Sequence, residues 1–155
     1  MTSDWELNTH KKSLKIYTNK KGYQMGQIIS KSVKKIVKEA LASVDSISVQ
    51  EAKSLIENER YQFVDVRELS EQQNVGVIPV AILSSRGMIE FHIDPDSPLH
   101  KSEFAQEKTY IFYCASGARS ALAAVAAKDM GLKPVVNMAG GITEWIKNSG
   151  SITDR

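Results

Sequence analysis

The segment Thr109–Tyr113 constrains the fold more than any other part of the sequence. It reads Thr-Tyr-Ile-Phe-Tyr, a run of aromatic and β-branched residues that favours a β-strand. Because the run is almost wholly apolar, we expect both faces of the strand to be covered, as in a central strand of a parallel sheet. An alanine-rich helical segment, 118–130, follows after a short loop, and Gly131 suits the position just past its end. These features predict a strand–loop–helix unit at the centre of an α/β domain.

Segments typical of strands alternate with segments typical of helices along the rest of the chain. The other expected strands are 61–66, 80–83 and 135–138. The other expected helices are 48–58, with a capping box at Ser48, 68–73, 98–106 with Ser97 as N-cap, and a last one after Gly140–Gly141. Residues 86–98 are expected to form a long loop. The alternation predicts an α/β fold with a mainly parallel sheet flanked by helices.

Two segments precede the domain, which we expect to span residues 46–150. Residues 1–24 are polar with weak periodicity, so they are predicted to form a flexible tail, and Met25 is an alternative natural start. Residues 25–45 are predicted to form an amphipathic helical extension, because apolar residues recur at helical spacing across 27–43.

The N-terminal part of the chain is strongly basic. Nine lysines lie between Lys11 and Lys38, and the only acidic residues before Glu39 are Asp4 and Glu6. No arginine or interleaved aromatic cluster accompanies these lysines. We therefore interpret them as residues of a solvated tail and of the solvent-exposed face of a helix. Neither a nucleic acid nor a membrane is expected as a partner. The sequence has no apolar run of about 20 residues and no secretory signal, which favours a cytoplasmic location.

The only cysteine, Cys114, directly follows the central strand. The loop after it consists of Ala115, Ser116, Gly117, Ala118, Arg119 and Ser120. Ligands of open α/β sheets bind at the carboxyl ends of the strands, where the next helix also offers unpaired N–H groups. A loop of small residues can curl around one centre, and such a ring of donors favours a reactive thiolate. The alternative interpretation is a buried, inert cysteine.

Four motifs, in this order along residues 46–149, resemble those of the rhodanese family. They are Asp65-Val66-Arg67-Glu68, Gly76-Val-Ile-Pro79-Val-Ala81, the loop Cys114–Ser120, and Met138-Ala-Gly140-Gly141 followed by Trp145. The resemblance implies a rhodanese-like fold, in which a central, mainly parallel five-stranded sheet is flanked by helices.

The resemblance also implies a sulfurtransferase that needs no metal or organic cofactor. The Cys114 thiolate would take a sulfane sulfur from a donor as a persulfide, and an acceptor would then remove it. The implied partners are a small sulfur donor, either thiosulfate or a persulfide, and a thiol or cyanide acceptor. A protein persulfide is a further candidate donor.

Several charged and polar residues are candidates for supporting this chemistry. Asp65 is placed to accept N–H bonds from the loop, and Arg67 is a candidate for receiving an anionic substrate. Arg119 either binds the donor or steadies the persulfide, or it forms a structural ion pair with Glu68 or Asp65. Ser120 either lines the loop or is an ordinary residue of the first helical turn.

Two other functions are compatible with the same residues. One is a sulfur-carrying or protein-interaction module without efficient turnover, in which the helix 27–43 docks a partner. The other is a small cysteine phosphatase, which is disfavoured because four residues separate Cys114 from Arg119 where such phosphatases typically have five. The chain departs from the family pattern at Val80, which replaces a glycine. It also has only one cation in its loop, so thiosulfate is expected to be a poor donor.

Overall fold

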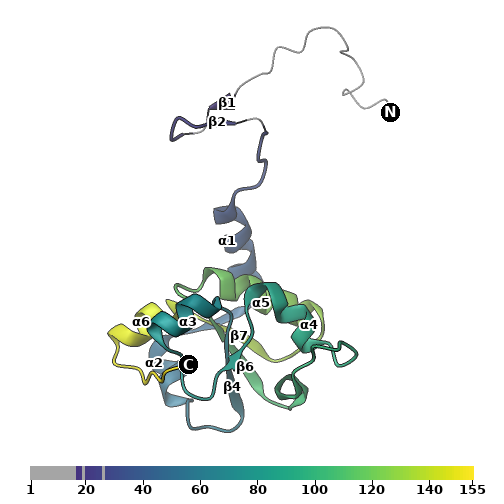
Figure 1. The fold of residues 1–155 in the computed structure, drawn as a ribbon, viewed down its shortest axis with the longest axis vertical. Helices are drawn as coiled ribbons and strands as arrows, with labels where there is room; N and C mark the ends of the chain where they lie inside the picture. The colour runs from purple at the N-terminus through teal and green to yellow at the C-terminus, as the bar shows by residue number, and fades with distance from the viewer. Residues whose placement is uncertain (1–16, 19, 26) are drawn as a thin grey trace. The chain divides into compact units, whose positions relative to one another are not determined.

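The computed structural model describes residues 17–18, 20–25 and 27–155, and the chain divides into two units, 1–32 and 33–155 (Figure 1). In the first unit, β1 (Tyr17–Thr18) pairs antiparallel with β2 (Gln24–Met25). Gly22 lies between them with φ of +83°, a conformation that glycine adopts without strain. The flexible tail predicted for 1–24 stays a prediction, since residues 1–16 and 19 lie outside the described part.

A five-stranded, wholly parallel sheet forms the centre of the second unit. Its strands are β3 (Asp45–Ile47), β4 (Tyr61–Asp65), β5 (Ile82–Leu83), β6 (Thr109–Tyr113) and β7 (Val135–Met138). Their order is β3-β7-β6-β4-β5, so the apolar run predicted to be central is the middle strand. The predicted α/β fold with a parallel sheet flanked by helices is therefore confirmed. The strand β3 is an addition, since its Asp-Ser-Ile sequence carries no strand signal.

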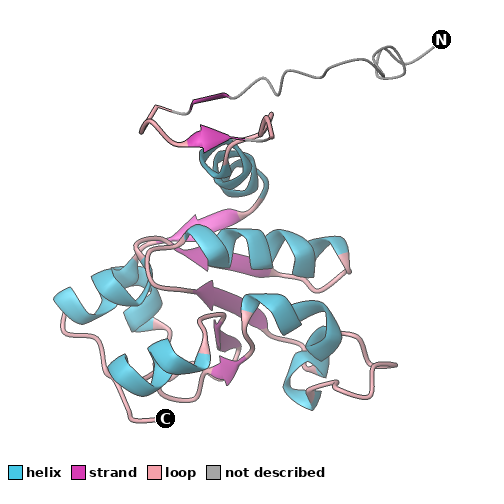
Figure 2. Ribbon diagram, turned by 45° about the horizontal axis from the view of Figure 1, so that its top comes forward, coloured by secondary structure: helices cyan, strands magenta, loops and turns pink. Residues whose placement is uncertain are grey.

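Helices cover both faces of this sheet (Figure 2). They are α1 (Val33–Ser43), α2 (Val49–Ser54), α3 (Leu69–Val75), α4 (Ile89–Ile93), α5 (Ala118–Asp129) and α6 (Gly141–Lys147). On one face, residues of α4 and α5 pack with β4 and β6 around Phe112. On the other face, α2 and α6 pack around Trp145, which is fully buried and meets Phe63 edge to face with ring centroids 5.6 Å apart. Cys114 belongs to the first of these clusters, and the preceding residue, Tyr113, belongs to the second.

The helix α1 begins at Val33 instead of the predicted Gln27. Ile28 and Ile29 are 67% and 68% exposed, so the apolar residues before α1 gain little burial. Because helices in proteins are stabilised mainly by packing an apolar face, this stretch lacks the stabilisation that would make it helical.

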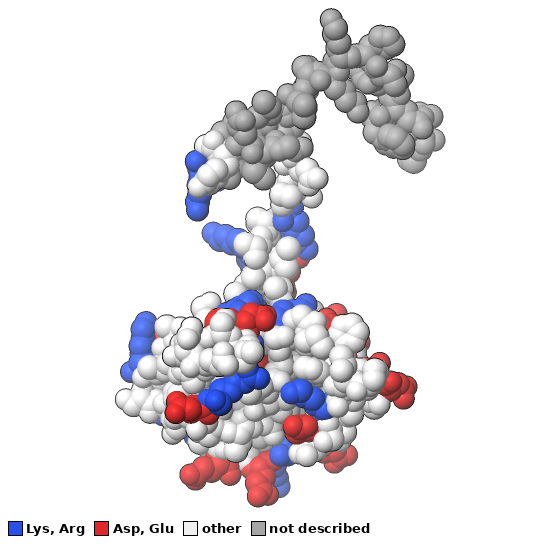
Figure 3. Space-filling view, viewed as in Figure 1, with Lys and Arg blue, Asp and Glu red and all other residues white. Residues whose placement is uncertain are grey.

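Basic side chains gather on the surface of α1 (Figure 3). No helix in the described part of the chain combines the length and the hydropathy needed to cross a membrane.

The segment between β5 and β6 differs most from its prediction. The expected loop 86–98 contains a 3₁₀ turn at Arg86–Met88 and the helix α4, whose Ile89 and Ile93 are buried one turn apart. The helix expected at 98–106 is wrong, because only a 3₁₀ helix at Ser102–Ala105 forms there. The Ser97 hydroxyl accepts the Leu99 N–H at 3.1 Å, which makes a local turn instead of a helix cap.

Three other elements are shorter than predicted. The Ser48–Glu51 capping box is present, but α2 ends at Ser54 instead of Asn58. The strand expected at 61–66 ends at Asp65. The strand expected at 80–83 is reduced to β5, because Val80 has φ of +61° and lies in the preceding turn.

The conformation of Val80 yields a test of backbone strain. A β-branched residue in the left-handed region costs roughly 1–2 kcal/mol. Its side chain is 75% exposed, so little burial is lost on truncation. We expect Val80→Gly to raise the free energy of unfolding by about 0.5–1 kcal/mol, because glycine relieves the strain but has more unfolded-state entropy. Urea denaturation measures this, with Val80→Ala as the control that keeps Cβ. A glycine variant no more stable than the alanine variant would contradict the strain.

Candidate active site

The loop after β6 curls around the sulfur of Cys114. Cys114 follows the last strand residue directly, and its side chain is almost fully enclosed, with 1% of the residue exposed. Gly117 has φ of +101° and is the N-cap of α5. This left-handed conformation turns the backbone so that the Gly117 N–H donates to Cys114 Sγ at 3.1 Å. The turn therefore depends on a residue without a side chain at position 117.

Further donors surround the same sulfur atom. The Ser120 hydroxyl lies 3.4 Å from Cys114 Sγ. Burial of the thiol raises the pKa of Cys114, but hydrogen bonds lower it by more. They come from the hydroxyl and backbone N–H of Ser120 and from the backbone N–H groups of Gly117 and Ser116. The net result is a pKa of Cys114 below its usual value, as a nucleophilic thiolate requires.

Asn137, a residue that the sequence analysis missed, supports the loop from β7. Its Oδ1 accepts the Ser120 hydroxyl at 2.6 Å, and its Nδ2 donates to the Gly117 carbonyl at 3.3 Å. The Ser120 hydroxyl has one proton, so its bonds to Asn137 and to the sulfur are alternatives. A polar residue within the buried strand Val-Val-Asn-Met was the available signal for this contact.

The N-terminus of α6 fixes the other side of the loop. The Ile142 N–H donates to the Cys114 carbonyl at 2.9 Å, and the Thr143 N–H donates to the Ala115 carbonyl at 3.1 Å. A Cβ on Gly141 would overlap these two carbonyl groups. Glycine at position 141 is therefore needed for the close approach of α6 to the loop.

Arg119 forms an ion pair with Glu71 of α3, not with the predicted Glu68 or Asp65. Both terminal nitrogens of Arg119 donate to the two carboxylate oxygens of Glu71, each at 2.7 Å. These bonds lower the pKa of Glu71 to about 2 and raise the pKa of Arg119. Glu68 instead precedes α3 as its N-cap, and its N–H donates to Glu71 at 3.0 Å. The Glu-x-x-Glu spacing signals this cap but not the pairing with Arg119.

Arg67 and Asp65 form a second ion pair, which is fully buried. Arg67 Nη2 lies 2.7 Å from Asp65 Oδ2, and the exposed fractions of the two side chains are 1% and 0%. Arg67 Nη2 also donates to the Gly76 carbonyl at 2.7 Å, and Asp65 accepts the Arg67 N–H at 2.9 Å. These contacts favour a structural function for the pair over the predicted contact between Arg67 and a substrate.

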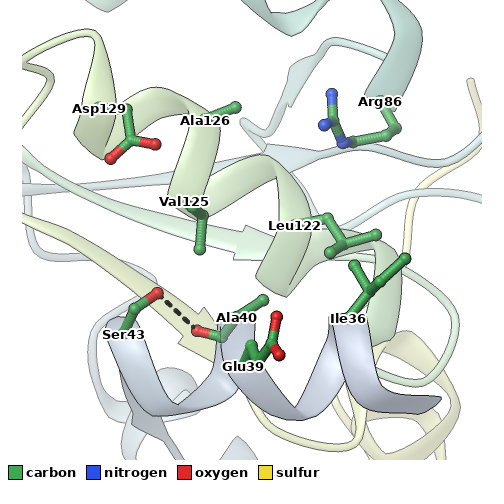
Figure 4. Close-up of a pocket in the computed structure, with 9 residues that line it drawn as sticks. All are labelled: Ile36, Glu39, Ala40, Ser43, Arg86, Leu122, Val125, Ala126 and Asp129. Carbon is green, nitrogen blue, oxygen red and sulfur yellow. Dashed lines mark hydrogen bonds between the residues drawn. The ribbon is translucent and has the colours of Figure 1, made fainter. Parts of the chain in front are cut away.

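Four cavities lie near these elements, and one of them, of about 190 Å³, is lined by Arg67, Glu68 and Arg155 among others. The cavity between α1 and α5, of about 410 Å³, is shown in Figure 4 and contains none of the predicted site residues. A smaller one of about 220 Å³ lies against Ser116, Gly117 and Ala118. The fourth, of about 460 Å³, is lined by residues of α3 and α6 and reaches Ala115 and Glu71. We call it the α3–α6 cavity. The described residues contain no group of three or more potential metal ligands.

Comparisons with known proteins agree with this geometry. Residues 48–148 match the family model of the rhodanese-like domain. A sulfurtransferase from Allochromatium vinosum is 30% identical over 105 residues, which cover 68% of this chain and 88% of that protein.

Two solved structures illustrate the similarity of fold. A protein of unknown function from Rhodopseudomonas palustris, designated a possible tyrosine phosphatase, is 40% identical with a TM-score of 0.80. The match covers 83% of this chain and 99% of that one. A rhodanese-like domain protein from Staphylococcus aureus is 30% identical with a TM-score of 0.55, over 66% of this chain and 91% of that one.

The donors around the sulfur yield a test by pH titration. We expect Ser120→Ala to raise the pKa of Cys114 toward its usual value, because the variant removes a hydroxyl that stabilises the thiolate. The thiolate then forms only at higher pH, which its ultraviolet absorbance reports. Ser116→Ala is the matched control, since Ser116 acts through its backbone N–H. An unchanged pKa in Ser120→Ala would mean that the wild-type hydroxyl donates to Asn137 Oδ1 and not to the sulfur.

Proposed function

The chain belongs to the rhodanese-like domain family, and we propose that it is a sulfurtransferase that carries a sulfane sulfur on Cys114. The donor is thiosulfate or a persulfide, and the acceptor is a thiol or cyanide. The observation that carries this proposal is the set of hydrogen-bond donors around Cys114 Sγ, led by the Gly117 N–H at 3.1 Å. Such donors stabilise an anion in an enclosed place where water cannot.

In the first step, the Cys114 thiolate attacks the outer sulfur of the donor. With thiosulfate, a new S–S bond forms to Cys114, the S–S bond of the donor breaks, and sulfite leaves with the bonding electron pair. The lowered pKa of Cys114 increases the fraction of the thiolate, which is the nucleophile. Because the cysteine is almost fully enclosed, the body of the donor must lie outside the loop.

In the second step, the acceptor attacks the outer sulfur of the persulfide. Cyanide is converted to thiocyanate, or a thiolate acceptor is converted to a new persulfide. In both cases the Cys114 thiolate is the leaving group and is regenerated. The negative charge passes between the outer sulfur and Sγ, both near the N-terminus of α5. The N–H groups of that helix end therefore stabilise the anion before and after transfer.

A phosphatase is the alternative, and the R. palustris neighbour is designated a possible tyrosine phosphatase. Two features favour sulfur transfer. Four residues separate Cys114 from Arg119, and both carboxylate oxygens of Glu71 already hold the Arg119 guanidinium. A phosphoryl group would have to displace Glu71 to use this cation. Hydrolysis of an aryl phosphate by the wild type, absent from Cys114→Ser, would favour the phosphatase instead.

Mass spectrometry of the intact protein tests the proposed function. Incubation with thiosulfate or a small persulfide is expected to add the mass of one sulfur atom, located on Cys114. Cyanide should then remove this mass and release an equal amount of thiocyanate. The control is Cys114→Ser, which should gain no sulfur. Equal behaviour of the two proteins would contradict the proposal, whereas loading without repeated turnover would indicate a sulfur carrier.

A further inference from the structure

Each arginine near the loop is neutralised by its own carboxylate. Arg119 is held by Glu71 through two bonds of 2.7 Å, and Arg67 is held by the buried Asp65. Glu68 adds a further negative charge beside Arg119, close enough to influence its pKa. At these two arginines a doubly charged donor such as thiosulfate therefore meets ion pairs and an acidic side chain in place of an uncompensated cation.

Glu71 of the Arg119–Glu71 pair also lines the α3–α6 cavity. Its lining includes Glu71 and Ala115, and Val75, Ile142 and Ile146 supply apolar surface. Two cations also line it, each beside a carboxylate: Arg67 is held by Asp65, and Lys147 Nζ lies 3.8 Å from Glu144. Val75 and Ile146 remain 45% and 44% exposed, so apolar surface is available there. At about 460 Å³ the cavity can hold the body of a small organic molecule, whereas the cavity of about 220 Å³ at Gly117 is half that size.

We infer that the donor is an organic sulfane-sulfur compound with at most one negative charge, and that Glu71 selects against thiosulfate. The apolar body of the donor lies in the α3–α6 cavity, and its sulfane sulfur reaches Cys114. This inference rests on the proposed function and adds the chemical class of the donor. Organic persulfides and organic thiosulfonates share the required chemistry.

The transfer step balances for a thiosulfonate. The Cys114 thiolate attacks the outer sulfur of R–SO₂–S⁻, a new S–S bond forms, and the S–S bond of the donor breaks. The sulfinate R–SO₂⁻ leaves with the electron pair, and the persulfide Cys114–S–S⁻ remains. With an organic hydropersulfide R–S–SH, the thiolate R–S⁻ leaves in the same way, and the proton stays on the transferred sulfur.

Three donors separate charge from size when cyanide is the common acceptor. Thiosulfate has two charges and no organic body, methanethiosulfonate has one charge and a small body, and benzenethiosulfonate has one charge and an aryl body. For each protein, kcat/KM is measured with all three donors. Ratios between donors are compared, because partial unfolding of a variant lowers all three values equally.

The charge is tested with Glu71→Gln, which keeps an oxygen acceptor for the Glu68 N–H. Removing this carboxylate charge exposes the Arg119 cation, so kcat/KM for thiosulfate should rise about tenfold. For the singly charged benzenethiosulfonate the rise should be only about threefold, since the interaction scales with donor charge. An unchanged ratio between these donors would overturn the assignment of Glu71.

The cavity is tested with Ile146→Ser, which removes apolar surface without adding charge. The preference for benzenethiosulfonate over methanethiosulfonate should fall about fivefold, because the aryl group loses an apolar contact. Leu99→Ser is the matched control, since Leu99 is 50% exposed and does not line this cavity. An equal preference in the wild type and Ile146→Ser would overturn the cavity assignment. If the wild type used none of the donors and formed no persulfide, the proposed function itself would fail.

Discussion

The structure depends on holding an anionic sulfur in a place that is almost closed to water. A buried thiolate is unfavourable unless hydrogen-bond donors replace the solvent. Here the donors come from the chain itself: the Gly117 N–H lies 3.1 Å from Cys114 Sγ, and Ser116 and Ser120 add further bonds. This convergence requires a short loop, a left-handed residue at Gly117, and a helix that begins immediately afterwards. The succession of β6, loop and α5 supplies all three.

The neighbouring elements keep this loop in place. Asn137 of β7 bonds to the Gly117 carbonyl and to the Ser120 hydroxyl, while the first N–H groups of α6 hold the carbonyls of Cys114 and Ala115. Arg119 ties the start of α5 to Glu71 of α3. The ion pair that ties α5 to α3 also neutralises Arg119, and in the proposed donor selectivity this same contact disfavours a dianion.

The central unit was predictable because its signals are local. The apolar run of β6, the small-residue loop and the alanine-rich α5 are adjacent in sequence, and the Ser48 capping box spans only four residues. The residues that were missed act across the sheet. Asn137 and Glu71 contact loop residues that are 17 and 48 positions away, and no spacing rule indicates which acidic residue Arg119 will reach. The helix α4 escaped prediction because its five residues show only one buried pair, and β3 because its pairing with β7 supplies what its sequence lacks.

The central claim is that the folded loop stabilises negative charge on Cys114. It is tested most directly by following the NMR chemical shift of the Cys114 Cβ across pH, in the folded protein and in the same chain unfolded in urea. The account predicts a lower titration midpoint in the folded protein, with the free energy of unfolding rising as pH increases through that midpoint toward the unfolded one. A folded midpoint equal to or above the unfolded one would contradict it, since the thiol would then behave as an ordinary buried cysteine.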